Sequence, residues 1–483
     1  MNRKILSFLL SILSAIFLIF TSLKPFIWGL AWVGFVPLFF AIQERNKWQV
    51  FLLSYFTGVL FFLGAIYWLA HVTVSGLIIL VLYLGLYFAI FGVVFSYIYR
   101  PEIKNMLLVS SCWVILEYIR NYILTGFGWA ILGYSQYNNL PIIQIADITG
   151  VYGVSFLLIL SNLTIYSFIR YKQKYPLILL MIVVVISYGY FKLNKKVEGE
   201  GLNIAVVQGN IPQDMKWDMA HKEFIKDKYF SLTKKILLDN PDLIIWPEAS
   251  VPVLLTWPKE VKQYLADLSR ENLLIGAIIK DREYYYNSAV LVTKNKLQRY
   301  DKIHLVPFGE YIPLKNIFPF LETVVGIGDF TPGKDYSVFS LNKQEKLAVL
   351  ICFEDIFSGI ARQFTKKGAN FLVNITNDAW FGDTSAPFQH MSFSIFRAVE
   401  NRRFVIRSAN TGISCFINSK GIVYSKISNK VGKSAFIEGS AVEKITLLDK
   451  KTFYTRFGDL FILLNLLFVL FNIYKINLRY SRE

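Results

Sequence analysis

The chain has 483 residues, of which 54% are hydrophobic and only 18% charged, and its mean hydropathy is +0.43. This composition excludes an ordinary soluble enzyme, because so apolar a chain must contact lipid. The formal net charge of +17 raises the question of a nucleic-acid partner. No zinc-ligand spacing, RNP-type aromatic motif or basic recognition helix accompanies the charge, so we expect no nucleic acid.

Membrane spans are the first elements expected along the chain. Crossing about 30 Å of hydrocarbon takes about 17 to 25 apolar residues. Such runs, one of them shorter, lie near 5–22, 26–43, 50–70, 76–99, 106–119, 151–169, 175–191 and 457–474. The first run is expected to be a retained span rather than a signal peptide, because no small-residue cleavage site follows it. We therefore predict eight spans.

These runs divide the chain into three predicted parts. Residues 1–195 form an N-terminal transmembrane bundle of seven spans, residues 200–446 form one globular domain, and residues 455–483 form a last span with a short tail. In the globular part charges alternate with short apolar runs, as in a water-exposed domain.

The distribution of basic residues predicts the orientation. Cytoplasmic loops are enriched in Lys and Arg. With eight spans, successive loops alternate between the two sides of the membrane, so every second loop should carry these residues. The basic residues on that side are Arg3, Lys4, Arg45, Lys47, Arg100, Lys104, Arg170, Lys172, Lys174, Lys475, Arg479 and Arg482. The short loops of the opposite side carry only Lys24 and Arg120. The seventh span then delivers the globular domain to the exterior side.

An acidic residue occurs inside the short fifth run. Glu117 lies three residues before Arg120, which is the helical spacing of an ion pair. An ionisable residue at membrane depth is a functional hypothesis. A structural pair near the interface is an equally good interpretation.

The globular domain alternates β-rich runs with helical patterns. The β-rich runs are NIAVVQ, DLIIWPE, NLLIGAI, SAVLVT, LAVLICFE, FLVNITND, FVIRSAN and ISCFIN. Helical patterns between them include residues 222–239 and 388–402. This alternation predicts a layered α/β domain.

Three side chains at the ends of such runs suggest covalent chemistry. Glu248 closes DLIIWPE, where partial desolvation would raise its pKa and suit it to proton transfer. Cys352 follows a strand and precedes a helical pattern, a position where a helix N-terminus favours thiolate. Glu354 and Asp355 oppose that effect, so a cation is needed, and Lys302 is the candidate that would also stabilise an oxyanion.

Each of these residues also has an ordinary structural interpretation. A cysteine at a strand end is often a small buried hydrophobe, Glu248 could cap a turn, and Lys302 could be a surface charge. Cys112 and Cys415 keep the buried interpretation. The three cysteines show no disulfide, redox or metal spacing, and the four histidines form no HExxH pattern. His304 remains ambiguous, and we expect no metal.

The order WPE, DKIHLVPFGEY, ICFED resembles the nitrilase superfamily, whose Glu-Lys-Cys triad lies in an α-β-β-α sandwich. The resemblance implies that Glu248 is general base and acid, Lys302 the oxyanion stabiliser and Cys352 the nucleophile. Glu310 in PFGEY matches a further active-site glutamate of that superfamily.

Nearly the whole chain is similar to the apolipoprotein N-acyltransferase family. The similarity is carried by WVILEYIRNYILTGFGWAILGYSQ, QGNIPQDMKW, the YYNS at 285–288 and FGDTSAPFQH. It implies that Trp217 and Asn287 lie around the substrate and that Phe353 and Glu354 support the site. Phe353 is a departure, because relatives commonly have tyrosine there, and any role of that hydroxyl is in doubt.

This resemblance implies a ping-pong acyl transfer without metal or soluble cofactor. Cys352 would take an acyl chain from a membrane glycerophospholipid as a thioester and pass it to the α-amino group of a diacylglyceryl-cysteine on an apolipoprotein. The enzyme would be a monomer in the bacterial inner membrane, with its catalytic domain facing the periplasm.

Apolar loops beside the motifs agree with a lipid substrate. They are residues 250–257, 311–328 and 379–381, and about half of their residues are expected to pack on the sandwich. Loop 311–328 is predicted to be a mobile lid at the membrane surface.

Two other functions compete with this interpretation. A membrane-tethered nitrilase-like amidase would use the same three residues on small amides. A transporter or scaffold would use the bundle, but few polar residues lie in the predicted spans, so this ranks last.

Overall fold

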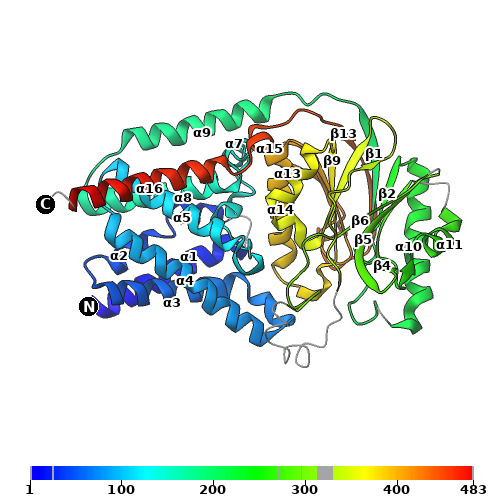
Figure 1. Ribbon diagram of the computed structural model, residues 1–483, viewed down its shortest axis with the longest axis horizontal. Coiled ribbons are helices and arrows are strands. Elements are labelled where there is room, and N and C mark those ends of the chain that lie inside the picture. The colour runs from blue at the N-terminus through cyan, green and yellow to red at the C-terminus, as the bar shows by residue number, and fades with distance from the viewer. Residues whose placement is uncertain are drawn as a thin grey trace. The chain divides into compact units, whose positions relative to one another are not determined.

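The computed structural model describes residues 3–23, 27–216, 218–268, 272–294, 296–312 and 330–480. The chain packs as two compact units. The first comprises Met1–Lys195 with Thr452–Glu483, and the second Lys196–Lys451. Figure 1 shows that the first unit is helical and that the second contains the strands.

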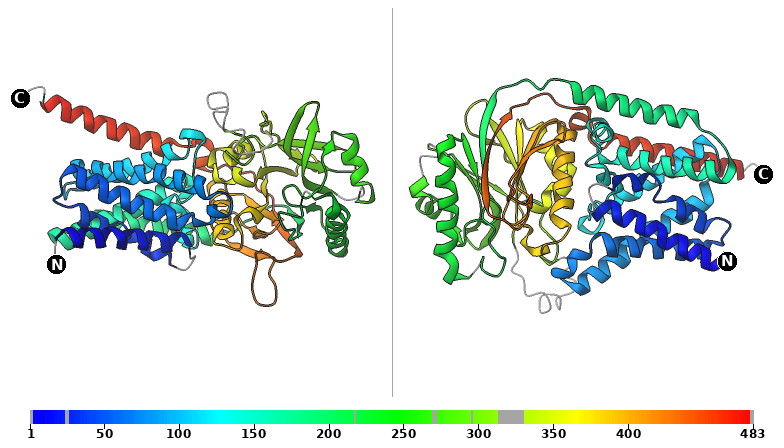
Figure 2. Two further views of the ribbon diagram at one scale, coloured as in Figure 1. Left: turned by 90° about the horizontal axis from the view of Figure 1, so that it is seen from below. Right: turned by 180° about the vertical axis from the view of Figure 1, so that it is seen from behind.

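The first unit is a bundle of helices joined by short 3₁₀ segments (Figures 1 and 2). Its α-helices are α1 (Arg3–Leu23), α2 (Val36–Ile42), α3 (Lys47–Ala65), α4 (Val74–Ile98), α5 (Ile103–Arg120), α6 (Leu140–Ile143), α7 (Ala146–Thr149), α8 (Val151–Tyr171), α9 (Pro176–Asn194), α15 (Phe453–Phe457) and α16 (Leu460–Tyr480). The 3₁₀ segments are η1 (Trp28–Trp32), η2 (Tyr67–His71), η3 (Ile123–Thr125) and η4 (Leu132–Gln136).

The structure supports part of the expected set of eight spans, of which the fifth was expected to be short. Within the described residues, five helices are long and apolar enough to cross a membrane, namely α1, α3, α4, α8 and α9. The run expected at 26–43 is broken, because η1 ends at Trp32 and α2 begins only at Val36. The segment Leu460–Lys475 is shorter, and α5 carries Glu117 and Arg120 near its end.

A polar side chain of α8 compensates for the break between η1 and α2. The Phe35 amide donates to Asn162 Oδ1 at 2.7 Å, and Asn162 Nδ2 donates to the Ala31 carbonyl at 2.8 Å. Phe35 then stacks on Phe88 and meets the edge of Trp113. The break therefore leaves no unsatisfied backbone group at these two positions, as a lipid environment requires.

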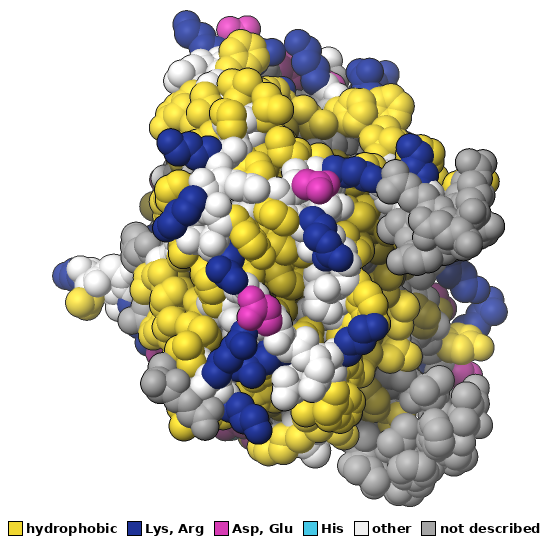
Figure 3. All heavy atoms as spheres, turned by 90° about the vertical axis from the view of Figure 1, so that its left-hand side faces the viewer, with side chains coloured by type: hydrophobic (Ala, Val, Ile, Leu, Met, Phe, Trp, Pro, Cys, Tyr) yellow, Lys and Arg dark blue, Asp and Glu magenta, His cyan; other side chains and the backbone are white. Residues whose placement is uncertain are grey.

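Three of the loops expected on one side of the membrane meet at one end of this bundle. Glu44 forms ion pairs with Arg3 at the start of α1 and with Arg170 at the end of α8. Arg45 donates to the Arg3 carbonyl at 2.6 Å. Figure 3 shows a face on which Lys and Arg side chains, with few acidic ones, lie among hydrophobic side chains.

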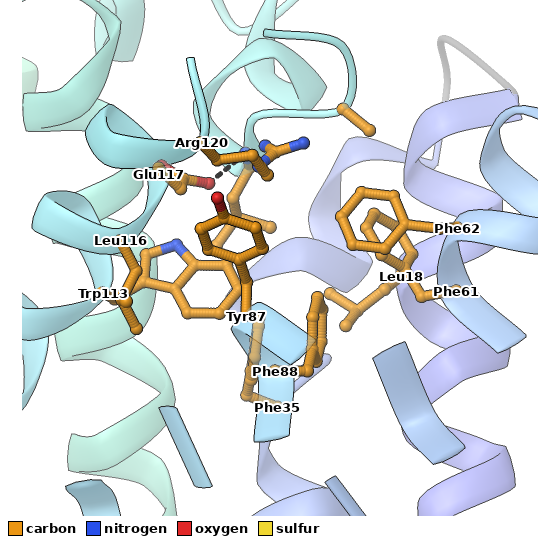
Figure 4. Close-up of a pocket in the computed structure, with 12 residues that line it drawn as sticks. Leu18, Phe35, Phe61, Phe62, Tyr87, Phe88, Trp113, Leu116, Glu117 and Arg120 are labelled. Carbon is orange, nitrogen blue, oxygen red and sulfur yellow. Dashed lines mark hydrogen bonds between the residues drawn. The ribbon is translucent and has the colours of Figure 1, made fainter. Parts of the chain in front are cut away.

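The Glu117 and Arg120 side chains bind the backbone of the segment that follows α5. Glu117 Oε1 accepts from the Leu132 amide and Arg120 donates to the Trp129 carbonyl, both at 2.7 Å. Both residues line a cavity whose other walls are mainly aromatic and aliphatic, including Phe62 and Tyr87 (Figure 4). These contacts support the structural interpretation of the pair.

The second unit contains two β-sheets that face each other. The first sheet has the order β13-β1-β2-β4-β5-β6, with β3 paired to β4, and the second has the order β12-β11-β10-β9-β8-β7. The strands of the first sheet are β1 (Gly201–Gln208), β2 (Leu243–Ile245), β3 (Leu255–Thr256), β4 (Leu273–Asp281), β5 (Tyr284–Val292), β6 (Leu297–Asp301) and β13 (Gly439–Thr446). Those of the second are β7 (Phe339–Ser340), β8 (Lys346–Ile351), β9 (Phe371–Thr376), β10 (Phe404–Ala409), β11 (Cys415–Ile417) and β12 (Val423–Lys426).

Helices cover the outer faces of both sheets. In Figure 1, α10 (Lys222–Ile236) and α11 (Lys259–Tyr264) lie on the first sheet, and α13 (Ser358–Lys366) and α14 (Ala386–Asn401) on the second. The remaining short 3₁₀ segments are η5 (Met219–His221), η6 (Leu237–Asp239), η7 (Ala266–Leu268), η8 (Cys352–Ile356) and η9 (Asp378–Phe381). The expected α-β-β-α sandwich is therefore confirmed for this unit.

The sandwich interior follows from the apolar strand runs. The eight predicted β-rich runs coincide with β1, β2, β4, β5 and β8 to β11. Between the sheets, Ser408 Oγ donates to the carbonyls of Val207 and Ile245, so β10 is joined directly to β1 and β2. Edge strands such as β12 and β13 were not predicted, because their half-exposed residues do not form an apolar run.

Candidate active site

The three predicted catalytic residues follow three different strands. Glu248 comes after β2, Lys302 directly after β6, and Cys352 directly after β8. The first two strands belong to one sheet and the third to the other. The site is thus assembled between the two sheets from residues more than a hundred positions apart.

Glu248 lies in a tight turn packed against β4. A Cβ atom on Gly276 would lie 2.6 Å from the Glu248 Cα, so only glycine allows this approach. The Ser250 amide donates to the Gly276 carbonyl at 2.9 Å and the Gly276 amide to the Pro247 carbonyl at 3.2 Å. The turn that carries Glu248 is thereby fixed against β4.

Asn287 joins the two glutamates of the site. Its Nδ2 donates to Glu248 Oε1 and to Glu310 Oε1, each at 2.8 Å. Its Oδ1 is buried and has no hydrogen-bond partner among the described residues. Asn287 is therefore placed to orient both carboxylates and still accept one hydrogen bond.

Lys302 is almost completely buried between the same carboxylates. Its Nζ lies 2.9 Å from Glu310 Oε2 and 3.7 Å from Glu248 Oε1, and 1% of the side chain is exposed. Burial by itself lowers the pKa of the lysine, but the carboxylates of Glu310 and Glu248 outweigh it and raise the pKa above its usual value. Lys302 is consequently a permanent cation.

Cys352 adopts a strained backbone conformation where β8 ends. Its φ is +50°, a left-handed value that costs about 1 kcal/mol or more in a residue other than glycine. The Cys352 carbonyl lies 3.2 Å from His390 Nε2 and accepts from Asn374 Nδ2 at 3.4 Å. These contacts from α14 and β9 hold the sharp turn that presents the sulfur.

The Cys352 sulfur receives less help from a helix N-terminus than the sequence pattern suggested. Burial, and then the charges of Glu248 and Asp378, raise the pKa of the Cys352 thiol, and Lys302 opposes them only in part. The segment after the cysteine is the five-residue 3₁₀ segment η8, so little helix dipole acts on the sulfur. These effects favour the thiol form of Cys352, so a neighbouring base would assist its ionisation.

Glu354 connects the cysteine turn to the lysine segment. One carboxylate oxygen accepts from Tyr300 Oη and the Ile303 amide at 2.7 Å, and the other accepts from the Ile351 amide at 2.8 Å. The side chain is fully buried, and burial raises its pKa to about 7 against the pull of these donors. Glu354 thus fixes Lys302 relative to Cys352.

A buried network of charged side chains contacts the cysteine turn through His390. His390 Nδ1 lies 2.8 Å from Asp378 Oδ1, and Arg407 Nη2 lies 3.6 Å from Asp378 Oδ2. Arg407 also lies 3.3 Å from Asp355. Burial favours the neutral acid, but His390 and Arg407 outweigh it and lower the pKa of Asp378. Sequence reasoning missed this network, because its members become neighbours only through β9, β10 and α14.

Lys216 is a further residue that sequence reasoning missed. Its Nζ donates to the Glu248 carbonyl at 2.9 Å, and the residue is 2% exposed. The sequence signal for Lys216 is its place in QDMKW, next to the predicted substrate-contacting Trp217. Trp217 itself lies outside the described residues.

The remaining predicted positions lie around this centre. The Phe353 ring packs against His304 and Phe357, so the position contributes an aromatic wall. His304 stacks on Phe357 with ring centroids 3.9 Å apart.

The apolar loops are only partly buried. Val251 and Leu255 are buried, whereas Leu254 and Trp380 are exposed. Residues 313–329, which include most of the expected lid, lie outside the described residues.

The chain is similar to known proteins over most of its length. Residues 14–164 match the family described as apolipoprotein N-acyltransferase N-terminal domain, and residues 203–436 match carbon-nitrogen hydrolase. The chain is 39% identical to the apolipoprotein N-acyltransferase of Geobacter metallireducens over 94% of this chain and 92% of the relative. It is 32% identical to that of Rickettsia prowazekii over 99% of both chains.

Solved structures match about half of the chain at lower identity. A CN-hydrolase superfamily protein from Xanthomonas campestris is 17% identical, with a TM-score of 0.40, over 51% of this chain and 91% of its own. A branch 10 nitrilase superfamily member from Saccharomyces cerevisiae is 18% identical, with a TM-score of 0.39, over 52% of this chain and 92% of its own.

Proposed function

The chain belongs to the apolipoprotein N-acyltransferase family, and we propose that it acylates lipoproteins through a thioester on Cys352. The observation that carries the proposal is the convergence of the Cys352 thiol, one buried cation and two carboxylates between the sheets. This set suits covalent acyl transfer, which needs a nucleophile, a base and an oxyanion stabiliser.

In the first half-reaction Glu248 takes the proton of the Cys352 thiol. The sulfur attacks the ester carbonyl of a glycerophospholipid, and the Lys302 ammonium stabilises the oxyanion. When the carbon–oxygen bond breaks, Glu248 returns its proton to the leaving alkoxide, and a lysophospholipid departs. Glu310 and Asn287 keep Lys302 and Glu248 in position throughout.

In the second half-reaction the acceptor is the free α-amino group of a diacylglyceryl-cysteine on an apolipoprotein. The amine attacks the thioester carbonyl and passes one proton to Glu248. Breaking the carbon–sulfur bond forms the amide, and the sulfur leaves as thiolate and recovers that proton. The unpartnered Asn287 Oδ1 is available to accept a hydrogen bond from the amine.

The membrane supplies the donor, and the first unit keeps the enzyme in it. We propose eight crossings, with the broken segment η1–α2 and the helices α5 and α16 crossing beside the five long helices. Three loops that carry basic residues meet through Arg3, Glu44 and Arg170, which supports placing them together on the cytoplasmic side. The sandwich would then face the periplasm, and the exposed Leu254 and Trp380 would be available to contact lipid.

Intact-mass analysis tests this function directly. The purified full chain is incubated with phosphatidylethanolamine of one defined acyl composition, and we expect one acyl adduct that maps to Cys352. A synthetic diacylglyceryl-cysteine peptide should then discharge the adduct and gain its mass.

Two variants make the result specific. Cys352→Ala should form no adduct, whereas Cys415→Ala should behave as wild type, because Cys415 is a fully buried thiol. An adduct that forms only with small amides would favour the amidase, and N-acylation retained by Cys352→Ala would overturn the covalent mechanism.

A further inference from the structure

The charges of the proposed site do not balance without Lys216. Glu248 and Glu310 carry two negative charges around the thiol, and Lys302 supplies one positive charge. A thiolate formed there would face an excess of negative charge, which disfavours it. The ammonium of Lys216 is a second cation that opposes the charge of these two carboxylates.

The geometry of Lys216 suits this role. It precedes η5 on the loop that follows β1, and its Nζ is fixed by the Glu248 carbonyl at 2.9 Å. An ammonium has three N–H groups, and that carbonyl is the only acceptor that the described part of the chain offers it. The titratable groups that act on it electrostatically are Glu248, after β2, and Cys352, after β8.

We propose that Lys216 is a second active-site cation, a positioning residue that stabilises the Cys352 thiolate together with Lys302. The inference rests on the proposed roles of Cys352 and Glu248. When the thiol proton moves to Glu248, the S–H bond breaks and an O–H bond forms without a change in net charge. Lys216, tied to the backbone carbonyl of Glu248, then acts electrostatically on the new thiolate.

A pH dependence distinguishes this role from a purely structural one. Burial lowers the pKa of Lys216 to about 8, against the opposing effect of Glu248 and Cys352. The charge is therefore present below pH 8 and is lost as the pH rises above it. Its help to the thiolate should disappear over the same range.

The test measures alkylation of Cys352 by iodoacetamide from pH 6 to 9.5, using the detergent-solubilised full chain and intact mass. One pKa unit corresponds to a tenfold change in thiolate, so Lys216→Met and Lys216→Gln should alkylate about tenfold more slowly than wild type at pH 7. The difference should vanish above pH 9. Lys216→Arg should keep the wild-type rate at pH 7 and retain its advantage above pH 9, since arginine stays charged.

The control is Lys235→Met, which removes an exposed lysine of α10 and should match wild type. Equal rates for wild type and Lys216→Met at all pH values would overturn the inference, and so would a slowing that persists above pH 9. If Lys216→Met does not fold, the comparison of Lys216→Gln with Lys216→Arg decides the same question. The assay contains no lipid, so failure of the acyl-transfer proposal would show separately as the absence of an acyl adduct.

Discussion

Burial at single residues shapes the chemistry of this site. The Cys352 thiol, the Lys302 ammonium and the Glu354 carboxyl all lie inside the sandwich, and burial favours the neutral form of each. Lys302 remains charged because Glu310 and Glu248 lie beside it. Burial therefore favours the thiol form of the nucleophile, and in the proposed mechanism Glu248 takes its proton.

Replacement of Glu354 by glutamine tests the connection between cysteine and lysine. Every hydrogen-bond partner of the Glu354 carboxylate is a donor. A glutamine amide would direct its own NH₂ group at one of these donors. A buried unsatisfied donor costs about 1 to 3 kcal/mol, so Glu354→Gln should lower the free energy of unfolding by that amount. Acyl-adduct formation should slow as well.

The pH dependence of unfolding gives an independent check. Because the folded pKa of Glu354 is about 7 and the ordinary value 4.5, the folded chain takes up a proton below pH 7 that the unfolded chain takes up only near 4.5. The stability of wild type relative to the variant should therefore increase as the pH falls from 8 to 5. The control is Glu283→Gln, which replaces an exposed glutamate. Equal melting temperatures of wild type and Glu354→Gln at every pH would contradict the raised pKa of Glu354.

At the scale of elements, side chains hold two turns in place, one in each unit. The turn between β8 and η8 has a positive φ at Cys352 and is held through α14 by His390. In the bundle, α5 holds the following segment through the Leu132 amide and the Trp129 carbonyl. The first turn depends on a side chain distant in sequence, and the second depends on side chains of α5.

The α5 contacts lead to a stability prediction. Glu117→Ala would leave the Leu132 amide without its acceptor in a region where water cannot replace it. We expect the melting temperature of the detergent-solubilised protein to fall, with a loss of about 1 to 3 kcal/mol. The rate at which iodoacetamide alkylates Cys352 should remain unchanged below the melting transition.

The matched control for this experiment is Glu102→Ala, because Glu102 is an exposed acidic residue just before α5. A Glu117→Ala variant that keeps the wild-type melting temperature but loses acyl transfer would show instead that Glu117 has a functional role in the membrane.

At the scale of the whole molecule, the proposed topology places the basic loops and the sandwich on opposite sides of the membrane. Single cysteines in a Cys352→Ala background can test this, because Cys112 and Cys415 are buried. Lys430→Cys lies in the second unit and Lys172→Cys in the turn after α8, and both positions are exposed. A membrane-impermeant maleimide applied to spheroplasts should label position 430 and reach position 172 only after permeabilisation. The reverse pattern would invert the topology.

Much of the architecture could be predicted because local patterns carry it. Eight apolar β-rich runs became strands, and the helices at 222–236 and 386–401 appeared where the pattern indicated them. The break at 33–35 was not predictable, since Asn162, far along the chain, supplies the polar partners that make it possible. The order of the Glu248, Lys302 and Cys352 motifs was sufficient to indicate the nitrilase superfamily, and further segments of both units indicated the N-acyltransferase family.

By itself, then, the sequence determined the membrane character, the layered domain and the identity of the three central residues, because hydropathy and motif order are local properties. Only the tertiary structure revealed the burial that raises the pKa of Cys352, the hydrogen bonds of Glu354 and the place of Lys216. These properties arise from burial and from charges brought together by different strands. No stretch of the chain contains that information, because the residues concerned are far apart in sequence, as Lys216 and Cys352 are with a separation of 136 positions.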